Sequence, residues 1–205
     1  GFETKYPDLY SMSIIFKCFA GHRLVDIFGP IPYSEYGTGT NVSFDSEEEA
    51  YNLFFDELRE AVNILNDFEN NDPTADQIRY AKFDKSLYGG NYATWIKVAN
   101  TLRLRLAMRI SNVSPAKAQT EAEAAVQGGV LTSNEGSFEL PTGTIHPLVT
   151  ITSAWQETRL NAAVESILKG YNDPRLTIYA SPSSMDRAQT ITSAFLKLTS
   201  LINLK

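Results

Sequence analysis

Residues 46–65 carry the pattern that most constrains the fold, that of a capped amphipathic helix. Ser46 precedes Glu49 by three residues, so the hydroxyl and the carboxylate can each satisfy a free backbone donor at a helix start. Apolar side chains then recur at steps of three and four and form one face: Ala50, Leu53, Phe54, Leu58, Ala61, Val62 and Leu65. Because such a face has to be buried, this helix needs partner elements.

Two further segments are predicted to be long helices. Residues 8–20 are dense in apolar side chains, which favours a buried helix that stops near Gly21. Residues 91–111 repeat apolar positions at helical spacing, and Trp95 falls on their core-facing side. The connection over residues 21–46 contains glycines, prolines and aromatics, so we expect it to be a long, ordered surface loop.

Two shorter helices follow. Ser114 and Pro115 suit an N-cap and a first helical position. Ser153 and Gln156 repeat the capping-box spacing, and Trp155 opens the apolar stripe of a helix ending at Gly170. We therefore predict a mainly α fold, in which tetratricopeptide-like helix pairs pack as antiparallel neighbours and long irregular loops connect them.

Composition excludes several classes of protein. With 205 residues, 43% of them hydrophobic, the chain can bury a sizeable core. Its formal net charge of -6 disfavours a nucleic-acid partner, because a phosphate backbone requires a basic surface. Arg103, Arg105 and Arg109 lie on an otherwise apolar helix, so we expect their stems to pack on the core and their charges to pair with carboxylates. No apolar run reaches the roughly 18 residues of a spanning helix.

Catalytic and metal-binding patterns are missing from the sequence. It contains no G-x-S-x-G, H-E-x-x-H or Walker loop, and Cys18 and His22 lack a third orienting group, so Cys18 is expected to be a buried structural thiol. His146 stands far from His22, which gives no metal-ligand spacing, and we expect no cofactor. A glycosidase pair of carboxylates stays open, because only distances in space define one.

Four stretches match a family pattern in order and spacing. They are RLVDIFGPIPYSEY (Arg23 to Tyr36), FDSEEEAYNLFFDELREAVNIL (Phe44 to Leu65), DKSLYGGNYATWIKVANTLRLRLAMRIS (Asp84 to Ser111) and TRLNAAVESILKGYNDPRLTIYASP (Thr158 to Pro182). Together they resemble the SusD/RagB family of surface glycan-binding lipoproteins from the outer membrane of Bacteroidetes. Position 30 departs from the pattern, since it is Pro where the family commonly has Asp.

The resemblance implies an α-helical fold built on tetratricopeptide-like pairs and a single domain over residues 1–205, an incomplete part of a longer chain. It implies a surface-exposed outer-membrane lipoprotein whose signal peptide and lipid anchor lie outside this sequence. The implied activity is the capture of oligosaccharides, without bond cleavage, for nutrient uptake by a SusC-like TonB-dependent transporter.

The matched stretches are scaffold, so they assign no binding residue. Sugars stack their C–H faces on aromatic rings, which makes Trp155 and Tyr36 the candidate glycan-stacking residues. Tyr33 is expected to be a structural pin whose hydroxyl bonds to backbone. Residues 172–175, Asn-Asp-Pro-Arg, are expected to form a tight turn held by the Asp and the Arg.

Two other functions stay open beside glycan capture. A helical-repeat scaffold would bind a protein or peptide in a groove. A hydrolase with an unrecognised carboxylate pair would release reducing ends over time.

Overall fold

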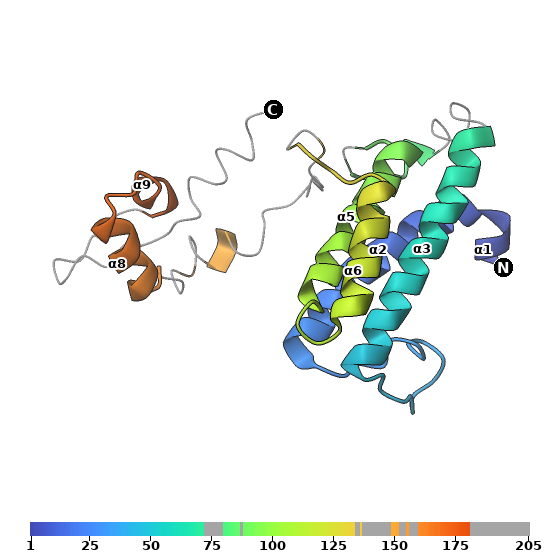
Figure 1. Cartoon of the computed structure of the whole chain (residues 1–205), viewed down its shortest axis with the longest axis horizontal. Helices are drawn as coiled ribbons and strands as arrows, with labels where there is room; N and C mark the ends of the chain where they lie inside the picture. The colour runs from blue at the N-terminus through green and yellow to red at the C-terminus, as the bar shows by residue number, and fades with distance from the viewer. Residues whose placement is uncertain are drawn as a thin grey trace. The chain divides into compact units, whose positions relative to one another are not determined.

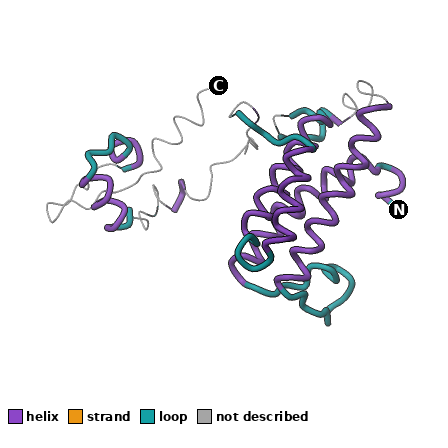
Figure 2. The backbone as a smooth tube through the Cα atoms, in the orientation of Figure 1, coloured by secondary structure: helices purple, strands orange, loops and turns teal. Residues whose placement is uncertain are grey.

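The computed structural model describes residues 1–71, 80–86, 88–133, 136, 149–151, 155 and 160–180. The chain divides into two compact units, Gly1–Pro141 and Thr142–Lys205, and each is described by itself. All the regular elements in the described residues are helices, apart from an isolated β-bridge between Ile31 and Asp45 (Figure 2). The prediction of a mainly α fold is thus confirmed.

The first unit is a bundle of antiparallel helices (Figure 1). A short α1 (Phe2–Lys5) leads into α2 (Pro7–Phe28), α3 (Glu47–Asn71), α5 (Tyr92–Arg109) and α6 (Pro115–Gln127). Helix α3 packs against both α2 and α5, and α5 packs against α6, so the α2–α3 and α5–α6 hairpins lie next to one another. The α2–α3 loop and the α5–α6 turn lie at the same end of the bundle (Figure 1).

The beginning of α3 is as predicted. The backbone N–H of Ser46 donates to Glu49 Oε2 at 2.8 Å, and the Glu49 N–H donates back to Ser46 Oγ at 3.2 Å. The predicted apolar face is buried or half-buried, and Tyr51 and Phe55 join it. Trp95 is also in the core, with 4% of its surface exposed.

Helix α2 does not stop near Gly21, as the sequence suggested, but continues to Phe28. Gly21 is needed there for close packing, because a Cβ at this position would lie 2.8 Å from Cε2 of Tyr33 and 3.1 Å from Cε1 of Phe54. The helix ends at Gly29, whose φ of +77° lies in the region that favours glycine. The glycine that ends α2 therefore lies eight residues, about two turns, beyond the glycine that the chain uses for packing.

Polar contacts tie the helices of the first unit together. The buried carboxylate of Asp8 accepts hydrogen bonds from Tyr80 Oη at 3.1 Å and Tyr92 Oη at 2.7 Å. Arg109 pairs with Asp26 at 2.9 Å, which joins α5 to α2. The predicted pairing of helix-borne arginines with carboxylates is confirmed for Arg109 and for the buried Arg103 described below, whereas Arg105 is exposed.

The second unit contains α8 (Ala162–Gly170) and α9 (Leu176–Tyr179). Helix α8 is capped by Asn161, whose side chain accepts from the Ala163 N–H at 2.8 Å, and it ends at the predicted Gly170. Its start was predicted wrongly, because Trp155 and Leu160 lie outside the helix. The predicted capping box of Ser153 and Gln156 lies outside the described residues. The turn after α8 is as predicted, because the Arg175 guanidinium bonds to both carboxylate oxygens of Asp173 and lowers the pKa of that carboxyl to about 2.

Candidate functional site

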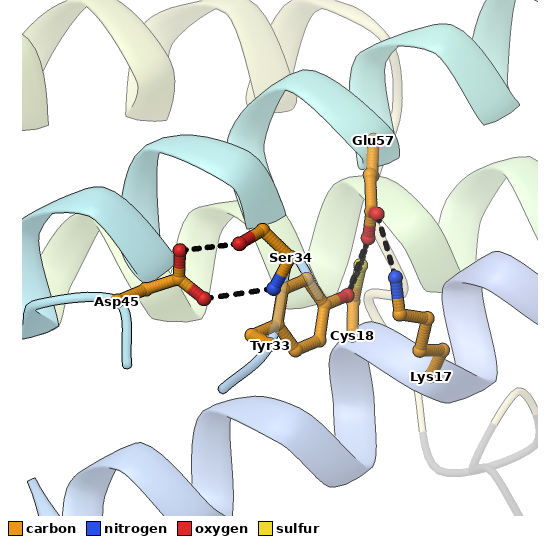
Figure 3. Close-up of polar contacts among 6 residues, drawn as sticks. All are labelled: Lys17, Cys18, Tyr33, Ser34, Asp45 and Glu57. Carbon is orange, nitrogen blue, oxygen red and sulfur yellow. Dashed lines mark hydrogen bonds and ion pairs between the residues drawn. The ribbon is translucent and has the colours of Figure 1, made fainter. Parts of the chain in front are cut away.

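The connection between α2 and α3 is an ordered loop that closes on itself. It runs from Gly29 to Ser46, eight residues shorter at its start than predicted, because α2 extends further. Ser34 donates to Asp45 through its backbone N–H, at 2.7 Å, and through its hydroxyl, at 2.6 Å. The Asp45 N–H in turn donates to the Ile31 carbonyl at 2.9 Å. The two ends of the loop are thereby fixed to each other, as Figure 3 shows for Ser34 and Asp45.

The outer part of the loop has its own hydrogen bonds. Glu35 Oε2 accepts from the Ser43 N–H at 2.8 Å, and the Glu35 carbonyl accepts from Thr38 Oγ1 at 2.7 Å. Tyr36 lies in this turn with 84% of its surface exposed, and Phe44 is 65% exposed. The structure thus presents two aromatic rings to solvent from a loop whose backbone is held at several points.

Tyr33 anchors the loop to the bundle through a polar cluster, which we call the Tyr33 cluster and define as the buried Cys18 and Tyr33, the half-buried Glu57 and the exposed Lys17 (Figure 3). Tyr33 Oη donates a short hydrogen bond to Glu57 Oε2, and Cys18 Sγ donates to the same oxygen at 3.2 Å. Lys17 Nζ pairs with Glu57 Oε1 at 2.8 Å. Tyr33 is a structural pin, as predicted, but its hydroxyl bonds to a carboxylate rather than to backbone.

The surroundings of the cluster keep the Cys18 thiol and the Tyr33 hydroxyl protonated, because they raise the pKa of both groups. Burial raises the pKa of the Cys18 thiol, and the neighbouring Glu57 carboxylate raises it further. Burial likewise raises the pKa of Tyr33. Cys18 has no exposed surface, so the prediction of a buried structural thiol is confirmed. A thiol held protonated in this way is not an activated nucleophile.

Cys18 and His22 lie on the same helix but do not form a thiol–imidazole pair. The Nδ1 atom of His22 is 3.2 Å from the Cys18 carbonyl oxygen, which assigns the proton to Nδ1 because a carbonyl can only accept. Nε2 is buried and has no hydrogen-bond partner among the described residues. Burial lowers the pKa of His22.

We expect this buried histidine to make the protein less stable in mild acid. At pH values below about 6.5 the unfolded chain protonates His22 while the folded protein resists it, so the free energy of unfolding falls as pH decreases, by at most about 1.4 kcal/mol per pH unit for one proton. Urea unfolding between pH 7.5 and 5 measures how steeply the free energy of unfolding depends on pH. His22→Phe should weaken this dependence, and an identical dependence in the two proteins would contradict the expectation.

Trp155, the other predicted stacking residue, lies in the second unit and is 61% exposed. Its backbone N–H donates to the Thr150 carbonyl at 3.1 Å. His146 lies outside the described residues. In the described part of the chain no three His, Cys, Asp or Glu side chains come together as metal ligands.

A cavity lies between α2 and α5. It has a volume of about 120 Å³ and a mostly apolar lining: Ile15, Phe16, Phe19, Trp95, Val98, Thr101, Leu102, Arg105 and Leu131. Such a lining has few partners for the hydroxyl groups of a sugar. The α2–α3 loop suits a polar ligand better, because exposed rings stand there beside backbone and side-chain hydrogen-bonding groups.

Comparison with known proteins assigns the fold to a family. The family model for the SusD and RagB outer-membrane lipoproteins matches residues 2–203. The chain therefore belongs to the SusD-like family. A comparison with curated proteins returned no match. None of the described helices is both long and apolar enough to cross a membrane.

Several solved structures are similar to this chain. A chitin-binding SusD homologue from Flavobacterium johnsoniae is 41% identical with a TM-score of 0.82, over 89% of this chain and 38% of its own. A SusD homologue from Bacteroides vulgatus is 36% identical with a TM-score of 0.79, over 91% of this chain and 37% of its own. A further chitin-binding protein is 34% identical with a TM-score of 0.68, over 85% of this chain and 37% of its own. The chain thus spans less than half the length of these relatives.

Proposed function

We propose that this protein binds oligosaccharides at the cell surface for nutrient uptake and does not cleave them. The observation that carries the proposal is the exposed ring of Tyr36 on a loop that hydrogen bonds hold in place. A ring on a fixed backbone can stack on the C–H face of a sugar with little loss of backbone conformational entropy, and polar groups of the loop can bond to hydroxyls. Two similar proteins described as chitin-binding make chito-oligosaccharides the first ligands to test.

Tyr36→Ala should weaken binding of a chito-oligosaccharide by about two- to tenfold, since an aromatic contact contributes about 0.5–1.5 kcal/mol. Isothermal titration measures the affinity, beginning with chito-oligosaccharides and continuing with plant and host glycans. Tyr171→Ala is the matched control, because Tyr171 is 83% exposed but lies in the second unit. Equal losses in the two variants, or none in either, would contradict a site at Tyr36.

Trp155 is the second candidate contact, and tryptophan fluorescence tests it separately. The sequence has two tryptophans, and Trp95 is buried, so a change on sugar binding should come from the exposed Trp155. The change should be saturable and should disappear in Trp155→Ala. A change that persists in this variant would exclude Trp155 as the reporter of binding.

Two further measurements test the rest of the proposal. Reducing ends assayed over time should stay constant, and their release would favour the hydrolase.

We infer that the partner is a SusC-like TonB-dependent transporter and that a lipid anchor holds the full-length protein in the outer membrane. Purification of the full-length protein from solubilised outer membranes should recover the transporter, and recovery of the protein alone would argue against that partner. Absence of glycan binding by a folded sample would favour the protein-interaction scaffold.

A further inference from the structure

The Tyr33 cluster connects the α2–α3 loop to the core through one carboxylate. Glu57 lies on α3, Lys17 and Cys18 lie on α2, and Tyr33 belongs to the loop (Figure 3). All three partners donate to Glu57. Its Oε2 accepts hydrogen bonds from both the Tyr33 hydroxyl and the Cys18 thiol, and its Oε1 pairs with Lys17. An ionised carboxylate only accepts hydrogen bonds, so Glu57 is the group on which the other three converge.

The contacts around Tyr33 leave its ring little freedom. Its ring centroid is 4.7 Å from that of Phe54 in an edge-on arrangement, and Lys17 Nζ lies 4.0 Å from the same ring centroid. The ring also covers Gly21, where no Cβ intervenes. Tyr33 is only 6% exposed, whereas Tyr36, three residues later, is 84% exposed. The buried ring and the exposed ring thus belong to one short segment.

Both residues between the two tyrosines are held by hydrogen bonds. Ser34, directly after Tyr33, is held by two hydrogen bonds to Asp45. The next residue, Glu35, is bonded to Thr38 and Ser43 on the far side of the turn. We therefore expect a shift of Tyr33 to move the turn that carries Tyr36, because both intervening residues are hydrogen-bonded to the rest of the loop.

We propose that Glu57 is a positioning residue for glycan binding, which acts by fixing Tyr33 and through it the orientation of Tyr36. This role rests on the proposed function, since it concerns the same ligand site. This role requires no contact between Glu57 and the glycan. A neutral amide in its place, as in Glu57→Gln, keeps only one acceptor oxygen for the Tyr33, Cys18 and Lys17 donors, so at least one of them loses its partner and the loop is held less tightly against the bundle.

The single cysteine provides a direct measurement of loop release. Because Cys18 is the only thiol in the chain and is fully buried beneath Tyr33, its reaction rate with Ellman's reagent reports the opening of the cluster. Glu57→Gln and Tyr33→Phe should each increase this rate by about tenfold, the effect of one lost hydrogen bond. Asp56→Asn is the matched control, since Asp56 is adjacent on α3 but its side chain is 64% exposed. Hydrogen exchange should rise in residues 33–45 and stay unchanged in α5 and α6.

A double-mutant cycle distinguishes positioning from general support of the fold. In the wild-type background Glu57→Gln should weaken glycan binding by about two- to tenfold, to the same extent as Tyr36→Ala. In the Tyr36→Ala background it should have no further effect, because its action passes through that ring. Additive losses would overturn the proposal, and so would an unchanged labelling rate and affinity in both Glu57→Gln and Tyr33→Phe.

The outcomes also separate this inference from the proposed function. If the wild-type protein binds no glycan, the proposed function fails, and the positioning role fails with it even where labelling shows that Glu57 closes the loop. If the wild type binds glycan and the loop variants open the cluster without loss of affinity, only the positioning role is overturned. Circular dichroism of every variant confirms that the helices are intact before either conclusion is drawn.

Discussion

Glu121→Ala is expected to lower the free energy of unfolding by about 3–5 kcal/mol, the cost of leaving a buried charge without its partner. Glu121 on α6 is 5% exposed, and its Oε2 accepts from Arg103 Nε on α5 at 2.6 Å. Its other oxygen lies 3.4 Å from Arg59 on α3. The variant therefore leaves the positive charge of the buried Arg103 without its carboxylate partner at the place where α3, α5 and α6 meet.

Urea unfolding at pH 7 measures this effect. Glu123→Ala is the control, because Glu123 lies on the same helix but is exposed, and its replacement should change stability by less than about 0.5 kcal/mol. The double variant Arg103→Leu and Glu121→Leu should recover much of the loss, since an apolar pair of similar volume replaces the ion pair without an orphaned charge. A loss below 1 kcal/mol in Glu121→Ala would show that water reaches Arg103.

Phe54→Ala is expected to cost about 3–5 kcal/mol as well, through lost burial and the cavity that remains. Phe54 is fully buried, and its ring centroid lies 4.7 Å from that of Tyr33 and 5.7 Å from that of Tyr51. The cavity would open beneath Tyr33, so the variant should also speed the labelling of Cys18.

The same unfolding measurement tests this expectation, with Phe83→Ala as the control. Phe83 is 69% exposed, so its replacement should hardly change the free energy of unfolding. Similar stabilities for the two variants would mean that the core around α2 and α3 collapses into the space that Phe54 leaves.

Helix α3 and the Tyr33 cluster show which features local sequence patterns can predict and which they cannot. The capping box and the apolar face of α3 depend on residues within four positions of each other, and the sequence predicted both. The same reasoning placed Trp95 in the core and Tyr33 as a pin. It missed Glu57, because Glu57 is 24 residues from Tyr33 and 39 from Cys18, and no short-range signal pairs them.

The sequence by itself determined the helical class, the capped start of α3, and the family to which the chain belongs, since periodicity, caps and matched stretches are all read along the chain. Only the tertiary structure decided that α2 continues past Gly21, because a glycine that ends a helix and one that admits a neighbouring ring look the same in sequence. The tertiary structure also brought Lys17, Cys18, Tyr33 and Glu57 together, and it buried Tyr33 while it left Tyr36, three residues later, exposed. Such contacts arise from the packing of α2 on α3, and that packing depends on the whole buried surface rather than on any local run of residues.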